Sequence, residues 1–203
     1  MAAATEQERA RSQDPGEPHR SRAARSDAAA PSADPAAAPE ARRGVAAAST
    51  RVRFEPELLD LPGGLSAPVH PAPTVGGELQ VPENVDHVGW WDGSAYAGDP
   101  FGSTVLAGHI DSAEQGLGFF TELLNLQVGD RVTLRSGTDE VRYRVTSTEL
   151  IDKDALATDT AAFGQTGDHR LVLITCSGRW RPEVHSYESN FVVVAHRVDQ
   201  PSR

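Results

Sequence analysis

Two reactive side chains each follow a short apolar run of the kind that forms buried strands. Residues 171–174 lead through Thr175 to Cys176, and residues 104–107 are followed after one glycine by His109. A cysteine attacks a carbonyl as its thiolate, and a neighbouring imidazole can stabilise that thiolate and return a proton to a leaving amine. The pattern therefore predicts nucleophilic cysteine chemistry at strand ends. The alternative, a cysteine that only packs as a small hydrophobic side chain, stays open on these residues alone.

His109 is preferred because it emerges at the end of an apolar strand run, the same kind of position as that of Cys176. His19 lies in the N-terminal segment. The others are predicted to be solvated or structural, in loops or at strand ends: His70, His87, His169, His185 and His196. Asp111 lies two residues beyond His109 and shares its face if the strand continues. It could orient the imidazole or contact substrate, and a turn-capping carboxylate is the equal alternative.

The composition excludes several classes of protein. The chain has 203 residues, 38% of them hydrophobic, which suffices for one core. A formal net charge of -10 argues against nucleic-acid binding, which needs clustered basic residues. No apolar run approaches the roughly 18 residues of a membrane span. The single cysteine excludes a disulfide framework and a site built from several thiolates.

The chain divides near residue 53. Residues 1–53 are rich in alanine and proline, and the first fifty contain no aromatic residue, so we expect a disordered tether. No secretory signal is visible after Met1. Residues 54–203 have the composition of a folded domain, large enough to close into a small β-barrel or β-sandwich.

Short apolar or alternating runs between turn signals predict a mainly β fold with one or two short helices. The strands are expected at 78–81, 104–107, 131–134, 141–146, 171–175 and 191–198. Residues 136–139 suit a hairpin turn, so the sheet should be mainly antiparallel. Residues 119–126 carry apolar residues at helical spacing and predict a short helix. Trp90 and Trp91 are expected in the core or at a barrel end.

Several ordered segments resemble the sortase family, most closely the actinobacterial class F group. They are Ala107-Gly108-His109-Ile110-Asp111, Gly129-Asp130 before a strand, and Leu173-Ile174-Thr175-Cys176. Supporting segments are Ala67-Pro68-Val69, Leu79-Gln80-Val81-Pro82, Gly89-Trp90-Trp91 and Tyr187-Glu188-Ser189-Asn190-Phe191-Val192-Val193. The resemblance extends from about residue 56 to residue 195.

The resemblance implies an eight-stranded barrel and a cysteine transpeptidase of the Gram-positive cell surface. Cys176 would attack the Thr-Gly carbonyl of a Leu-Pro-x-Thr-Gly-like sorting signal. An amine, typically from a peptidoglycan precursor, would resolve the thioacyl enzyme. His109 would protonate the departing glycine amine, and Thr175 would help to line the groove. The protein is expected to be a monomer outside the cytoplasm.

Sortases use a third catalytic residue besides the cysteine and the histidine, and at this position the chain departs from the family pattern. Sortases generally carry an arginine on the strand after the cysteine, where its donors can hold the substrate and the developing oxyanion. Here Asn190 precedes the run 191–195, which contains no arginine. Arg179 and Arg181 lie in the segment expected to be a connecting loop. We expect Arg181 to take the role, in part with Asn190, against the alternative that both arginines are surface charges.

Other functions fit the sequence less well. Papain-like enzymes place cysteine before histidine, and L,D-transpeptidases surround their cysteine with residues absent here. A metallohydrolase on His109 and Asp111 lacks a third ligand. A non-catalytic barrel that binds a peptide remains an alternative. No cofactor is required. Some sortases bind calcium near the loop of Asp152, Asp154 and Asp159, but without ligand periodicity these residues are expected to be a solvated face.

Overall fold

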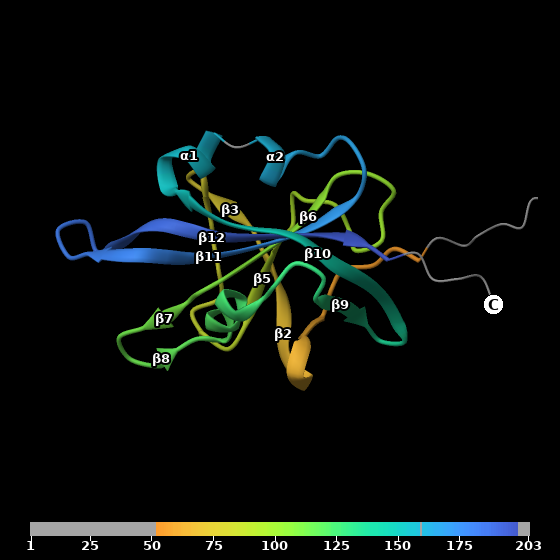
Figure 1. The fold of residues 1–203 in the computed structure, drawn as a ribbon, viewed down its shortest axis with the longest axis horizontal. Helices are drawn as coiled ribbons and strands as arrows, with labels where there is room; N and C mark the ends of the chain where they lie inside the picture. The colour runs from red at the N-terminus through yellow and green to blue at the C-terminus, as the bar shows by residue number, and fades with distance from the viewer. Residues whose placement is uncertain (1–51, 159, 199–203) are drawn as a thin grey trace, which may run out of the picture. The chain divides into compact units, whose positions relative to one another are not determined.

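The alternating and apolar stretches pair into a closed eight-stranded barrel in the computed structural model, which describes residues 52–158 and 160–198 (Figure 1). Around the barrel, the order is β1 (Leu58–Leu61), β2 (Leu65–Ala72), β5 (Val88–Trp91), β6 (Ser103–Gly108), β11 (Arg170–Arg181), β12 (Ser186–Arg197), β10 (Asp139–Asp152) and β9 (Arg131–Ser136), and β9 pairs with β1. Six of the eight pairings are antiparallel, while β2–β5 and β6–β11 are parallel. The predicted mainly β barrel is confirmed.

Smaller elements connect the barrel strands. Two short hairpins lie outside the barrel, β3 (Thr74–Val75) with β4 (Glu78–Leu79) and β7 (Asp111–Ser112) with β8 (Gly116–Leu117). The helical elements are η1 (Pro62–Gly64), η2 (Phe119–Asn125), α1 (Lys153–Thr158) and α2 (Thr160–Phe163). The short helix predicted at 119–126 is confirmed as the 3-10 helix η2, and the hairpin turn predicted at 136–139 joins β9 to β10.

Strands β6 and β11 are covered on both faces, which explains why their sequences are continuously apolar. Leu106 and Leu173 point into the barrel core, whereas Val105 and Val172 belong to an outer cluster. Leu156 from α1 and Ala162 from α2 complete that cluster. Strands buried on both faces need apolar residues at every position, and only a closed core with a second layer provides this. The two strands that precede His109 and Cys176 are therefore packed on both faces.

Several elements differ from the sequence prediction. Strands β1, β2 and β5 were not predicted, because β2 contains Pro68 and Pro71 and the other two have only four residues each. The strand predicted at 78–81 is limited to the two residues of β4, outside the barrel. Strands β11 and β12 extend well beyond the predicted runs and form a long hairpin that projects from the barrel (Figure 1). The stretch predicted as an acidic loop contains α1.

A buried histidine at the N-terminal end of β11 makes the fold sensitive to acid. His169 is 7% exposed and its Nε2 lies 2.9 Å from the hydroxyl of Tyr143. Burial lowers the pKa of His169 from 6.5 to about 4. Between those two pH values the unfolded chain binds a proton at this histidine and the folded chain does not. The contribution of His169 to stability is therefore fully present above pH 6.5 and is lost as the pH falls toward 4. Acidification through this range should lower the free energy of unfolding by up to about 3 kcal/mol through this histidine.

Urea unfolding at pH 7 and at pH 4.5 measures this effect. The wild-type chain should lose more free energy of unfolding over this interval than a His169→Gln variant, whose amide does not titrate. The difference between the two losses isolates the histidine from the carboxylates. Equal losses in both proteins would contradict the assignment.

One expectation cannot be compared with the described structure. The predicted disordered tether over residues 1–53 lies outside the described residues except for its last two positions. Within the described residues, none of the helices has the length and apolar character needed to cross a membrane.

Candidate active site

The parallel pairing of β6 with β11 brings the two predicted reactive residues together. The register pairs Gly108 with Thr175, so His109 and Cys176 are the next residues along the two neighbouring strands. The buried hydroxyl of Thr175 donates a hydrogen bond of 2.9 Å to the carbonyl oxygen of Gly108. This bond joins the strands at the point where both reactive side chains leave them. Thr175 is 2% exposed and does not line the pocket described below.

Gly108 allows the chain to pass close to the core before it turns at His109. A Cβ at this position would lie 2.7 Å from the ring of Phe120, which is fully buried. No side chain fits in that space without displacing the ring. The glycine therefore lets β6 end against η2, and it determines where the imidazole emerges.

Cys176 is a free, partly buried cysteine on the outer face of the barrel. Val172 and Ile174 precede it at two-residue spacing and both belong to the outer cluster, so Cys176 shares their face. Its direct cross-strand partner on β12 is Asn190, which is partly buried. Directly opposed residues in an antiparallel pair point to the same face, which places the Asn190 side chain beside the thiol. The alternative of a cysteine sealed within the core does not agree with this exposure.

A pocket of about 230 Å³ contains both reactive residues. It is lined by His109, Ile110, Asp111, Ser112, Ala113, Cys176, Trp180, His185, Ser186 and Tyr187. One wall comes from the β7 side and the other from the outer part of the β11–β12 hairpin; Figure 1 shows the two hairpins on the same side of the barrel. Asp111 and His109 also border a second hollow of about 380 Å³, which is lined in addition by Glu83, Ser112, Glu114 and Gln115.

The outer part of the β11–β12 hairpin turns its aromatic residues toward this pocket. The register between the strands shifts after Ser177, and Gly178 has a φ of 84°, a left-handed conformation that suits glycine. Beyond this bulge, Trp180 pairs with Tyr187, and their ring centroids lie 5.2 Å apart in an edge-to-face arrangement. Trp180 is 46% exposed, so a large apolar surface is available beside the thiol.

Tyr187 bridges the two walls of the pocket. Its hydroxyl donates a hydrogen bond of 2.6 Å to Oδ2 of Asp111 on β7. This bond raises the pKa of Tyr187 to about 12, with further contributions from burial and from the charges of Asp111 and Cys176. The phenol therefore keeps its proton at neutral pH. Asp111 accordingly has Tyr187 as its hydrogen-bond partner, an arrangement that the sequence analysis did not include.

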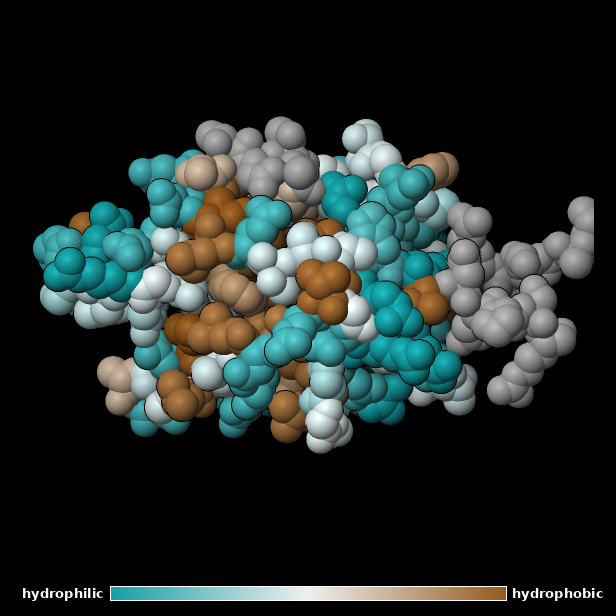
Figure 2. Space-filling model, viewed as in Figure 1, coloured by the Kyte–Doolittle hydropathy of each residue, from teal (hydrophilic) through white to brown (hydrophobic). Residues whose placement is uncertain are grey.

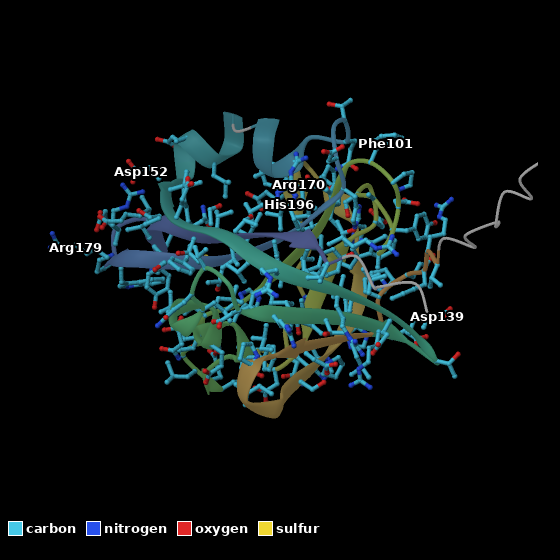
Figure 3. The ribbon with its side chains drawn as sticks, turned by 45° about the vertical axis from the view of Figure 1, so that its right-hand side comes forward. Phe101, Asp139, Asp152, Arg170, Arg179 and His196 are labelled. Carbon is cyan, nitrogen blue, oxygen red and sulfur yellow. The ribbon has the colours of Figure 1, made fainter. Side chains whose placement is uncertain are left out.

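The two arginines predicted to lie in a loop are instead part of strand β11. Arg179 and Arg181 are both exposed, and Arg181 pairs with Ser186 at the end of the hairpin. Figure 3 shows Arg179 projecting outward at the end of the hairpin, and Figure 2 shows that this end is mainly hydrophilic. Neither arginine lines the pocket. From this hairpin the pocket instead receives His185 from the turn, with Trp180 and Tyr187 from the strands.

The two described acidic residues of the predicted acidic loop, Asp152 and Asp154, belong to no group of three possible metal ligands among the described residues. Asp152 ends β10 and accepts a hydrogen bond of 3.1 Å from Ser189, while Asp154 is exposed in the first turn of α1. Asp159 lies outside the described residues. Within residues 52–158 and 160–198, no three His, Cys, Asp or Glu side chains are placed to hold a metal ion.

Comparison with known proteins agrees with the geometry of this site. The sequence profile of the Sortase domain family matches residues 62–198, which covers all eight barrel strands except β1. The chain belongs to the sortase family. Membership implies a cysteine transpeptidase, and sortases are in general associated with the cell surface. No curated protein sequence matches the chain.

Solved sortase structures share the fold. Sortase C-1 from Actinomyces oris aligns with a TM-score of 0.54 and 19% identity over 70% of this chain and 73% of that one. A lid mutant of sortase A from Corynebacterium diphtheriae aligns with a TM-score of 0.53 and 21% identity, over 74% of this chain and 73% of that one. Sortase C1 from Streptococcus agalactiae aligns with a TM-score of 0.52 and 21% identity, over 71% of this chain and 68% of that one. At these identities the likeness supports the sortase barrel and no finer assignment.

The sequence analysis missed the contribution of the β11–β12 hairpin to this sortase site. Tyr187 and Trp180 were not considered as site residues, and His185 was grouped with solvated or structural histidines. A signal was present, because Trp180 and Tyr187 flank the turn residues 182–185, and aromatic residues on opposite arms of a turn often form cross-strand pairs. The sequence analysis instead placed this segment in a connecting loop.

Proposed function

We propose that this sortase cleaves a Leu-Pro-x-Thr-Gly-like signal between Thr and Gly and transfers the acyl group to an amine. The observation that supports this most is the register of β6 and β11, which sets His109 and Cys176 side by side in one pocket. The reaction needs a partly exposed thiol and a nearby imidazole beside a groove for the peptide. Cys176 is partly exposed and lines one pocket together with His109, which supports the proposal.

The reaction proceeds through two acyl transfers. The Sγ thiolate of Cys176 attacks the carbonyl carbon of the Thr-Gly bond, and the resulting tetrahedral oxyanion collapses as the carbon–nitrogen bond breaks. The imidazolium of His109 gives its proton to the departing glycine amine. The acceptor amine then attacks the thioester, loses a proton to His109, and releases the thiolate. No net oxidation or hydrolysis occurs, and the enzyme returns to its starting state.

The remaining predicted residues take supporting roles in this proposal. Asn190, beside the thiol, can bind the substrate backbone through its amide. Thr175 supports the groove by fixing the carbonyl of Gly108. Asp111 lines the pocket and faces the substrate from the β7 side. Arg181 is proposed to stabilise the oxyanion, which requires its long side chain to reach the pocket from the end of β11.

Replacement of Arg181 by alanine tests that last role. If its guanidinium holds the oxyanion, turnover should fall by about 10²–10³ with little change in the melting temperature. Arg179→Ala is the matched control, because it removes the same side chain from an exposed position two residues away on the same strand. Similar, near-normal rates in both variants would remove Arg181 from the mechanism.

The finer assignments in this proposal rest on sequence resemblance. They are membership of the actinobacterial class F group, a position outside the cytoplasm of a Gram-positive cell, action as a monomer, and a peptidoglycan precursor as the acceptor. The solved structures named above are sortases A and C. The class F assignment is instead supported by the sequence segments around His109 and Cys176.

A ligation assay tests the proposed function. The protein is incubated with Leu-Pro-x-Thr-Gly peptides and triglycine, and the products are identified by mass spectrometry. The expected product joins the peptide through Thr to triglycine, and the expected intermediate is an acyl adduct on Cys176. Peptide binding without any cleavage would instead favour the non-catalytic peptide-binding barrel.

A further inference from the structure

The Tyr187–Asp111 hydrogen bond joins the two hairpins that form the walls of the pocket. Tyr187 lies at the start of β12 and Asp111 at the start of β7, 76 positions apart in the chain. We call this hydrogen bond the Tyr187–Asp111 clasp. The Tyr187 ring is held on one side by the edge-to-face contact with Trp180, so its hydroxyl has a fixed direction.

The β7–β8 hairpin is anchored elsewhere to parts of the fold away from β12. The carbonyl of Ile110 accepts hydrogen bonds of 2.8 Å from the Gly118 amide and 2.7 Å from the Thr121 hydroxyl. The side-chain amide of Gln115 donates to the carbonyl of Glu83 over 2.9 Å. These bonds fix the base and the outer side of the hairpin. The clasp fixes the side that faces Cys176.

The clasp also determines where a negative charge is held. Asp111 lines the pocket together with the thiol and the imidazole. The titratable groups that share its two hollows are His109, His185, Cys176, Tyr187, Glu83 and Glu114. A carboxylate that is free to turn toward a thiolate disfavours that thiolate, because like charges in a partly buried site repel. A carboxylate that accepts a short hydrogen bond from a phenol is partly neutralised and held in place.

We propose that Tyr187 is a positioning residue that holds the Asp111 carboxylate against β12 and partly neutralises its charge in the pocket that it shares with Cys176. This inference rests on the proposed function for its role in turnover, but the effect on the thiol is independent of any peptide. Loss of the hydroxyl should make the thiol harder to ionise. It should also widen the pocket, because the two hairpins lose their connection.

The pH dependence of Cys176 alkylation tests the charge effect. Cys176 is the only cysteine, so the rate of modification by iodoacetamide reports on one thiol. In Tyr187→Phe, which keeps the ring against Trp180, the midpoint of the rate profile should move up by about half a pH unit. At neutral pH this corresponds to alkylation about threefold slower than in the wild type.

A second variant separates charge from structure. The double variant Tyr187→Phe/Asp111→Asn also lacks the phenol hydroxyl, but it carries no carboxylate at position 111. Its alkylation midpoint should return to the wild-type value or fall below it. An unchanged midpoint in Tyr187→Phe would overturn the proposal. So would an upward shift that persists in the double variant, since that shift would come from structure rather than charge.

Ligation kinetics connect the clasp to turnover. Tyr187→Phe should lower kcat/KM by about tenfold, in line with the loss of one orienting hydrogen bond to a charged group. Tyr96→Phe is the matched control, because Tyr96 lies near the start of β6, at the opposite end from His109, and should keep its rate within about twofold. A wild-type protein that ligates no peptide but shows the expected alkylation shifts would refute the proposed function and leave the clasp supported.

Discussion

Replacement of Cys176 by alanine is expected to abolish peptide ligation. The chain contains no second cysteine, so no other thiol can form the thioacyl intermediate. Covalent catalysis divides a difficult transfer between two amines into two easier steps, and without the nucleophile neither step is available. Turnover should fall by at least about 10³, to the detection limit of the assay, and the acyl adduct on the protein should disappear.

The fold should survive this substitution. Cys176 is partly exposed at the edge of the outer cluster, so the loss of one sulfur atom leaves no large cavity. Ser177→Ala is the matched control, since it removes one polar atom from the neighbouring, partly buried position on the same strand. Ligation at the wild-type rate by Cys176→Ala would refute the cysteine mechanism, whatever the family of the chain.

The sequence predicted the strands that are buried on both faces or that alternate clearly. Strands β6 and β11 have continuous apolar runs because α1 and α2 cover their outer face, and these runs were recognised without the helices that explain them. Strand β2 could not be recognised, because its two prolines are tolerated only by its particular pairings with β1 and β5. Its partner β5 is too short to give a periodic signal.

The part of the site that lies at strand ends could be predicted from the sequence. His109 and Cys176 follow the two parallel strands, and parallel neighbours bring their C-terminal ends to the same edge. The walls of the pocket depend on contacts between distant segments, such as the bond from Tyr187 to Asp111. No local pattern encodes such a contact. The bulge at Gly178 lets β11 continue to Arg181, whereas the sequence analysis placed both arginines in a loop.

The second large effect is expected from His109→Ala. Cleavage of the Thr-Gly amide requires a proton on the departing nitrogen, because an amide anion is a very poor leaving group. General acid catalysis of this kind contributes about 10²–10⁴ to the rate, so ligation should slow by that factor. His196→Ala is the matched control. His196 is exposed and pairs with Arg170 on the same two strands, six pairs from Cys176, and Figure 3 shows its place on β12.

The leaving group can be changed to show that His109 acts as the acid and not only as a support for the pocket. If the Thr-Gly amide is replaced by an ester, the departing alkoxide needs far less assistance from a proton donor. His109→Ala should then lose much less activity on the ester than on the amide, while the wild-type enzyme processes both. A structural role would lower both rates by the same factor, because a distorted pocket does not distinguish oxygen from nitrogen at the scissile bond. The ratio of the two losses therefore measures the proton transfer itself.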